Sequence, residues 1–115
     1  MKHSHCVLLL ADRRQSHTAS LLKSSGYRLM MSFTPDHAVA LCVNNDIDAV
    51  VLDQQHFVVT DDWSVAQSIK MIKPRICVIL IVRGRIISKE QPDGIDAIVR
   101  DGDQVGLLET LKKLL

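Results

Sequence analysis

Four charged side chains in this sequence directly follow short apolar segments. Two are carboxylates, Asp12 and Asp53, and two are guanidinium groups, Arg83 and Arg100. A pair of carboxylates can bind Mg²⁺, which prefers oxygen ligands, and one carboxylate can act as a nucleophile toward a phosphoryl group. An arginine can bind a carboxylate or a phosphate through two parallel hydrogen bonds. This chemistry requires that the four side chains lie close together, which depends on the elements that carry them.

Short apolar segments alternate with segments of helical spacing, which is typical of a parallel sheet covered by helices. Strands are predicted over residues 6–10, 28–32, 49–52, 76–82 and 97–99. Helices are predicted near 16–25, from Thr34 onward, near 62–73 and over the last residues, where Val105, Leu108, Leu111 and Leu115 form an apolar stripe. Residues 83–96 contain Pro92 and Gly94, so only a short or irregular fourth helix is expected there.

This order predicts an α/β fold, a flavodoxin-like doubly wound sheet of five parallel strands in the order 2-1-3-4-5, with helices on both faces. The 115 residues correspond to one domain, residues 1–115. In such sheets the ligand crevice lies at the carboxyl ends of the first and third strands. Asp12 and Asp53 are therefore expected to converge in one cleft.

Composition excludes several classes of protein. The formal net charge is +1 and aromatic residues make up 3%, which argues against a nucleic-acid-binding domain. The longest apolar run, 76–82, is too short to cross a membrane, and the N-terminus has no signal-peptide layout. The three cysteines lie in apolar runs without disulfide or zinc spacing, as in a reducing compartment. The sequence therefore predicts a cytoplasmic protein without nucleic acid or membrane partners.

Four segments match a known family in their order and spacing: Leu8–Asp12, Ser25–Tyr27, Ile47–Asp53 and Gly94–Val99. Together they resemble the CheY-like receiver domains of response regulators, over essentially the whole chain. The resemblance implies that Asp53 is the phosphoacceptor and that Asp12 and Asp53 are the Mg²⁺ ligands. It also implies a signalling module of a two-component phosphorelay.

The chain departs from the receiver pattern at the positions that assist phosphorylation. Receivers have two acidic residues after the first strand, whereas one of these positions is Ala11 here. Where receivers have Thr or Ser after the fourth strand, this chain has Val82 and Arg83. The lysine position after the fifth strand falls on Asp101, with Arg100 one residue earlier. A degenerate receiver, or pseudo-receiver, with weak Mg²⁺ binding is therefore expected.

These observations predict a module that is not an enzyme, apart from accepting a phosphoryl group from a donor at Asp53. Because the chain ends with its last helix, output is expected to go through a docked protein: a histidine kinase, a downstream output protein or a second copy in a homodimer. In one alternative, Arg83 or Arg100 pairs with Asp53 and fixes a single state without phosphate. In another, the arginine-rich crevice binds an anion or small ligand.

Overall fold

The computed structural model of the chain has five parallel strands in the order β2-β1-β3-β4-β5. The structure describes residues 5–11, 17–53, 59–82 and 94–115, and for residues 59–64 it describes the backbone only. The strands are Cys6–Ala11 (β1), Arg28–Ser32 (β2), Ala49–Asp53 (β3), Cys77–Val82 (β4) and Ala97–Arg100 (β5). The predicted fold class and strand order are confirmed.

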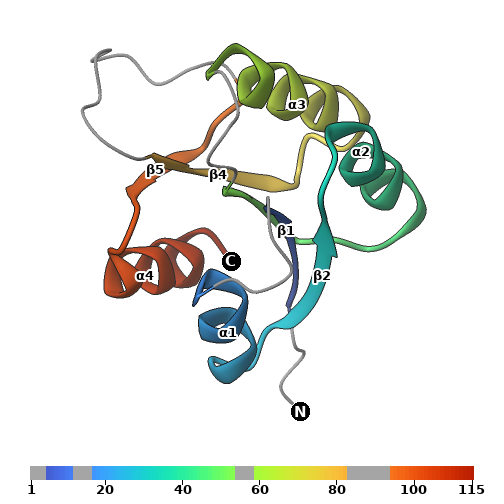
Figure 1. Cartoon of the computed structure of the whole chain (residues 1–115). Helices are drawn as coiled ribbons and strands as arrows, with labels where there is room; N and C mark the ends of the chain where they lie inside the picture. The colour runs from blue at the N-terminus through green and yellow to red at the C-terminus, as the bar shows by residue number, and fades with distance from the viewer. Residues whose placement is uncertain (1–4, 12–16, 54–58, 83–93) are drawn as a thin grey trace.

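Four helices in the described residues cover both faces of this sheet. They are His17–Ser24 (α1), Pro35–Asn44 (α2), Val59–Ile72 (α3) and Gln104–Leu114 (α4). Helices α2 and α3 pack on one face, and α1 and α4 pack on the other (Figure 1). No helix in these residues is long and apolar enough to span a membrane. The fourth helix predicted over 83–96 falls mostly on residues outside the described part.

Strand β1 is apolar along its whole length because both of its faces are covered. Every residue of β1 is buried, and alternate side chains point to opposite faces of the sheet. One set packs with α2 and α3: Cys6, Leu8 and Leu10. The other set packs with α1 and α4: Val7, Leu9 and Ala11. A strand buried on both faces needs apolar residues at every position, which is why β1 shows no alternation with polar residues.

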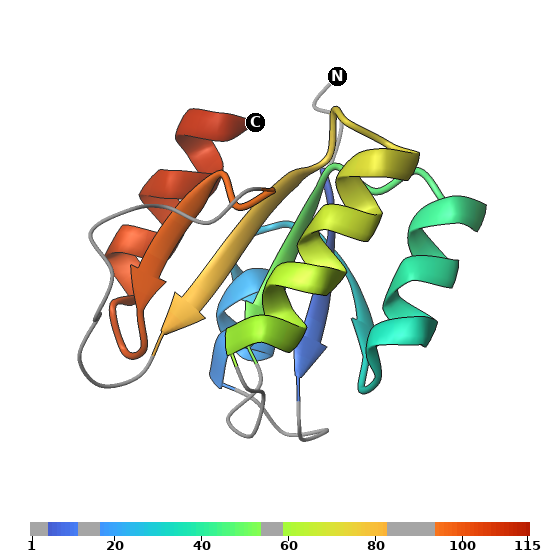
Figure 2. The same cartoon turned by 90° about the horizontal axis from the view of Figure 1, so that it is seen from above.

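The sheet has two distinct edges. All strand arrowheads in Figure 2 point toward one edge, here called the carboxyl edge, and the helices return the chain to the other, the amino edge. Each strand therefore begins at the amino edge and ends at the carboxyl edge. Asp53 and Arg100 end β3 and β5, so both lie at the carboxyl edge.

Two details of the helices differ from the prediction. Helix α3 begins at Val59, three residues before the expected start, because the residues before Asp62 continue the helix instead of forming a loop. In α4, Val105 is 66% exposed, whereas Leu107 and Leu111 are buried against the sheet. The predicted stripe was wrong at Val105, whereas Leu111 is buried as predicted and Leu115 packs against the same core cluster.

Candidate functional site

Asp53 is the acidic side chain that the fold places at the centre of the carboxyl edge. It ends β3, a strand with a neighbour on each side, and it pairs in register with Ala11 of β1. Its side chain is only 6% exposed, and Ser32 is the other buried polar side chain among the described residues. A carboxylate buried at this position needs polar or cationic partners. Asp53 therefore ends the third strand, as predicted, and its role as a phosphoacceptor stays a prediction.

The described side chains beside Asp53 do not supply the groups that receivers place there. Ala11, opposite Asp53, has no oxygen in its side chain and is 2% exposed. Val82 ends β4 and is half-buried, so an apolar side chain stands where a hydroxyl is expected. The predicted losses at both positions therefore fall at the carboxyl edge of the strands next to β3.

The end of β5 carries charges of both signs. Arg100 is exposed and pairs in register with Val82, so β4 lies between it and β3. The Asp101 N–H donates to the carbonyl of Val82 at 2.8 Å, and Gly102 then turns the chain with φ of 87°. Asp103 caps the N-terminus of α4, where its Oδ1 accepts the N–H of Gly106 at 2.9 Å. The acidic residue at the lysine position thus belongs to a tight turn into α4.

A small pocket of about 50 Å³ opens between α1, the end of β5 and the start of α4. Its floor is apolar, with Leu21 and Leu107 among its residues, and its rim contains Arg100 together with Asp101 and Asp103. The negative charges of the two carboxylates beside the guanidinium group disfavour the binding of an anion in this pocket. A space of this size holds a few waters and not a nucleotide, because a ligand pocket usually measures several hundred Å³.

The other predicted site residues, Asp12 and Arg83, lie outside the described residues. The convergence of Asp12 with Asp53 therefore stays a prediction, as does pairing of Asp53 with Arg83 or Arg100. The ion pairs found among described residues, His5–Asp48 and Lys70–Asp96, both lie at the amino edge.

The described residues supply one of the two carboxylates predicted to bind Mg²⁺, and the other, Asp12, lies outside them. Mg²⁺ is usually bound by one or two carboxylates with waters completing an octahedron, and Asp53 is the single carboxylate that the described strand ends bring to the centre of the carboxyl edge. No group of three or more metal-ligating side chains occurs in the described part of the chain. A weak site shared by Asp12 and Asp53 remains a prediction.

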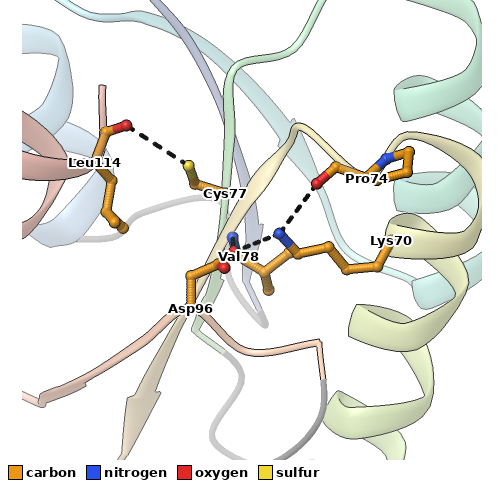
Figure 3. A network of polar contacts seen from close by, with 6 residues as sticks. All are labelled: Lys70, Pro74, Cys77, Val78, Asp96 and Leu114. Carbon is orange, nitrogen blue, oxygen red and sulfur yellow. Dashed lines mark hydrogen bonds and ion pairs between the residues drawn. The ribbon is translucent and has the colours of Figure 1, made fainter.

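The sequence reasoning missed a polar network at the amino edge, shown in Figure 3. Asp96, just before β5, accepts the N–H of Val78 at 2.7 Å and pairs with the ammonium group of Lys70 at 2.6 Å. The Lys70 ammonium also donates to the carbonyl of Pro74 at 3.4 Å. Asp48, just before β3, accepts the N–H of Cys6 at 2.8 Å. The sequence Ile-Asp-Ala occurs at the start of both β3 and β5. This repeat was the signal that could have indicated the matching roles of Asp48 and Asp96.

The cysteines behave as packing residues. Burial raises the pKa of the Cys42 thiol to about 11, with a smaller contribution from the nearby Cys6 and an opposing one from Lys73. Burial also raises the pKa of Cys77, assisted by the negative charge of Asp96 and opposed by Lys70. All three thiols are free. Few thiolates form at neutral pH at Cys42 and Cys77, so neither is a nucleophile there.

Comparison with solved structures gives close matches in fold. The receiver domain of an HD-domain-containing protein from Pseudomonas fluorescens superposes with a TM-score of 0.83 and 20% identity, over 100% of this chain and 89% of that one. CheY4 from Vibrio cholerae gives 0.83 and 16%, over 98% and 100%. The response regulator TrrA from Thermotoga maritima, solved in complex with Mg²⁺ and BeF, gives 0.76 and 23%, over 96% and 99%.

These matches show that the chain has the fold of CheY-like response-regulator receiver domains. No protein-family profile matches the sequence, and no curated protein matches it significantly. The similarity that these comparisons show therefore lies in the fold.

Proposed function

We propose that the chain is a receiver-like signalling module of a two-component system that acts by protein–protein docking, with phosphorylation of Asp53 weak or dispensable. The proposal is supported above all by Asp53, a buried carboxylate at the end of the central strand β3 on a receiver fold. The partner of the chain is a histidine kinase, a downstream output protein or a second copy of the chain. It works in the cytoplasm and is not an enzyme.

Weak phosphorylation follows from the residues around Asp53. A phosphoryl group gathers negative charge during transfer, and positioned cations and donors stabilise that charge. Removing one such group from an active site typically costs about 3 kcal/mol of transition-state stabilisation. In this chain Val82 stands where receivers have a hydroxyl side chain, and Asp101 stands where they have a lysine. Ala11 stands where they have a metal-binding carboxylate. Three such losses together disfavour efficient transfer.

The anion-binding alternative has no support in the described part of the chain. The pocket at the end of β5 contains Arg100, but Asp101 and Asp103 line the same rim. Arg83, the other arginine predicted at this crevice, lies outside the described residues.

Intact-mass spectrometry after incubation with acetyl phosphate and Mg²⁺ tests the proposal. We expect a phosphate adduct on a minor fraction of the chains or on none, and no adduct on the Asp53→Asn variant. Near-complete phosphorylation of Asp53, or an adduct at another residue, would contradict it. The docking role is tested with the same two proteins, because the wild type and Asp53→Asn should bind the same protein partner equally well with and without acetyl phosphate.

A further inference from the structure

Strand β2 is the last strand on one side of the sheet, and β1 is its single neighbour among the described strands (Figure 1). The Arg28 N–H donates to the carbonyl of His5 at 3.0 Å, so Arg28 directs its backbone toward β1. Successive residues of a strand direct their backbone groups to opposite sides, so Leu29 and Met31 direct theirs away from β1. Within the described residues, none of these outward N–H and carbonyl groups has a hydrogen-bond partner. The side of β2 that carries them is called the outer side of β2.

The sequence of β2 lacks the residues that usually keep an outermost strand from pairing. Protein sheets guard such strands with lysine, proline or a bulge, because unpaired backbone groups attract another extended chain. Strand β2 reads Arg-Leu-Met-Met-Ser, and its only charge is at its first residue. Leu29, Met30 and Met31 are half-buried, and each packs partly against one of the two core clusters. The outer side of β2 therefore combines unpaired backbone groups with apolar side chains on both faces of the sheet.

The apolar residues along this strand are arranged symmetrically about Met30. Leu29 and Met31 lie one residue from it, and Tyr27 and Phe33 lie three residues from it, in a chain with only 3% aromatic residues. Tyr27 is half-buried and Phe33 is 42% exposed. If two copies of β2 pair antiparallel with Met30 on the two-fold axis, Leu29 lies opposite Met31 of the other copy and exchanges backbone hydrogen bonds with it. Tyr27 then lies opposite Phe33 of the other copy, so the strand is complementary to itself.

The charges at the two ends of β2 are also complementary in this arrangement. Antiparallel pairing places the amino-edge end of β2 in one copy beside the carboxyl-edge end in the other. Arg28 is exposed at the amino-edge end, and Asp36 is exposed in the first turn of α2, four residues after the strand. Among the described residues, neither of them forms an ion pair. Opposite charges therefore meet at both ends, which favours antiparallel over parallel pairing of the two strands.

We propose that two copies of the chain pair through the outer side of β2, antiparallel about Met30, so that their sheets join into one continuous sheet. The proposal rests on the proposed function in taking docking as the role of the chain, and it assigns the surface and the partner. Asp53 and its phosphorylation play no part in the pairing, because Asp53 ends β3 and β1 lies between β3 and β2.

Disulfide cross-linking tests the register of the pairing. In the paired strands the two Met30 Cα atoms lie about 4.5 Å apart, which a disulfide can bridge. The two Arg28 positions lie roughly 13 Å apart along the strands, which is too far. Under mild oxidation we expect Met30→Cys to give several-fold more cross-linked dimer than Arg28→Cys or the wild type, which has the same three native thiols. Equal cross-linking of the two variants, or no excess over the wild type, would overturn the proposal.

Sedimentation velocity over a range of concentrations tests the backbone pairing without a new thiol. Leu29→Pro removes an outward N–H that the fold of one copy does not use, and proline is tolerated at such positions. We expect the dissociation constant of the dimer to rise about ten-fold or more, because hydrogen bonds are lost on both sides of the axis. Met71→Ser is the matched control, since it removes an 85% exposed apolar side chain from α3 and should leave the dimer unchanged.

Charge exchange supplies a test in which a misfolded variant cannot mimic the expected result. Arg28→Glu and Asp36→Lys should each weaken the dimer, and the two changes in one chain should restore it, because the exchanged charges meet again across the axis. A monomeric wild type, an unchanged dimer in Leu29→Pro, an equal loss in Met71→Ser or no recovery in the charge-exchanged chain would overturn the proposal. Each of these results leaves the phosphate-adduct assay at Asp53 and docking to another protein to be decided separately.

Discussion

Asp48 before β3 and Asp96 before β5 each make two hydrogen bonds to the backbone of one residue in the neighbouring strand, Cys6 and Val78 respectively, yet the strands that follow them are supported differently. Strand β3 pairs with β1 and β4, and all five of its residues are buried. Strand β5 pairs with β4 alone and has one buried residue, Val99. The chain compensates at β5 with a lysine from α3 and a glycine that allows close backbone contact. An edge strand that lacks a second neighbour thus depends on the adjacent helix for its position.

The largest difference in the free energy of unfolding is expected between two single variants, Asp96→Ala before β5 and Asp48→Ala before β3. Asp96→Ala leaves the buried N–H of Val78 without its acceptor and Lys70 without its counterion, and it should lower the free energy of unfolding by about 3 kcal/mol. Asp48→Ala should cost about 1.5 kcal/mol, because this side chain is 45% exposed and water can replace it. Urea unfolding measures both values. Equal losses, or a larger loss for Asp48→Ala, would remove the distinction.

Two glycines with positive φ form the next matched pair. Gly94→Ala should lower the free energy of unfolding by about 2.5 kcal/mol, because a left-handed backbone and a backbone contact with α3 both oppose a Cβ. Gly26 has a similar φ of +93° but nothing within 4 Å of a Cβ, so Gly26→Ala should cost about 1 kcal/mol. If thermal unfolding gives the same loss for both variants, the close approach of Gly94 to α3 does not constrain the fold.

Alkaline unfolding compares two thiols whose pKa is raised by burial, those of Cys42 and Cys77. The pKa of Cys42 rises from 9.0 to about 11 on folding, so its stabilising effect is complete below pH 9 and is lost between pH 9 and pH 11. At pH 10 the loss should be about 1.4 kcal/mol, which corresponds to one pH unit above the unfolded pKa. Cys42→Ala should therefore show a flatter decline of stability from pH 9 to pH 11 than the wild type. Cys77→Ala should flatten it less, and the opposite order would contradict the assignment.

The smallest expected difference in the free energy of unfolding is between the variants of two lysines at the end of α3, Lys70 and Lys73. Lys70→Met should cost about 1 kcal/mol, because it removes a short and partly shielded ion pair. Lys73→Met should cost about 0.3 kcal/mol, since it removes one hydrogen bond from the ammonium group to the Asn45 carbonyl. Added salt should narrow the gap between the variants, as screening weakens the Lys70–Asp96 pair. A gap that does not respond to salt would show that packing, and not charge, separates them.

Much of the fold could be predicted from the sequence because the strong signals were local. The apolar run Ile76–Val82 and the Thr34-Pro35 helix start each specify their element from neighbouring residues. Thr34, where this helix was predicted to start, caps α2 with its Oγ1 accepting the N–H of His37 at 3.3 Å. Strand order then followed from the handedness of the connections. The face of α4 that packs on the sheet could not be predicted from neighbouring residues. Leu107 and Leu108 are both apolar, and only the packing of α4 on the sheet decides that Leu107 is the buried one.

The candidate site was predicted only in part. The position of Asp53 followed from the strand that precedes it, and the structure buries its side chain at the expected edge. The roles of Asp96 and Lys70 were missed because their contact depends on how α3 packs beside β5, and these residues are 26 positions apart in sequence. Contacts of this kind are set by tertiary packing, and no local spacing rule reveals them.

We propose that Asp53 occupies the phosphoacceptor position of a receiver fold that lacks the assisting groups at Ala11, Val82 and Asp101. Restoring those groups tests it most directly: Ala11→Asp, Val82→Thr and Asp101→Lys in one chain, treated with acetyl phosphate and Mg²⁺ and analysed by intact mass. A folded restored chain should gain a phosphate adduct several-fold more abundant than that of the wild type, and Asp53→Asn in the same background should abolish it. A folded restored chain that gains no adduct, or gains one that survives Asp53→Asn, would contradict the claim.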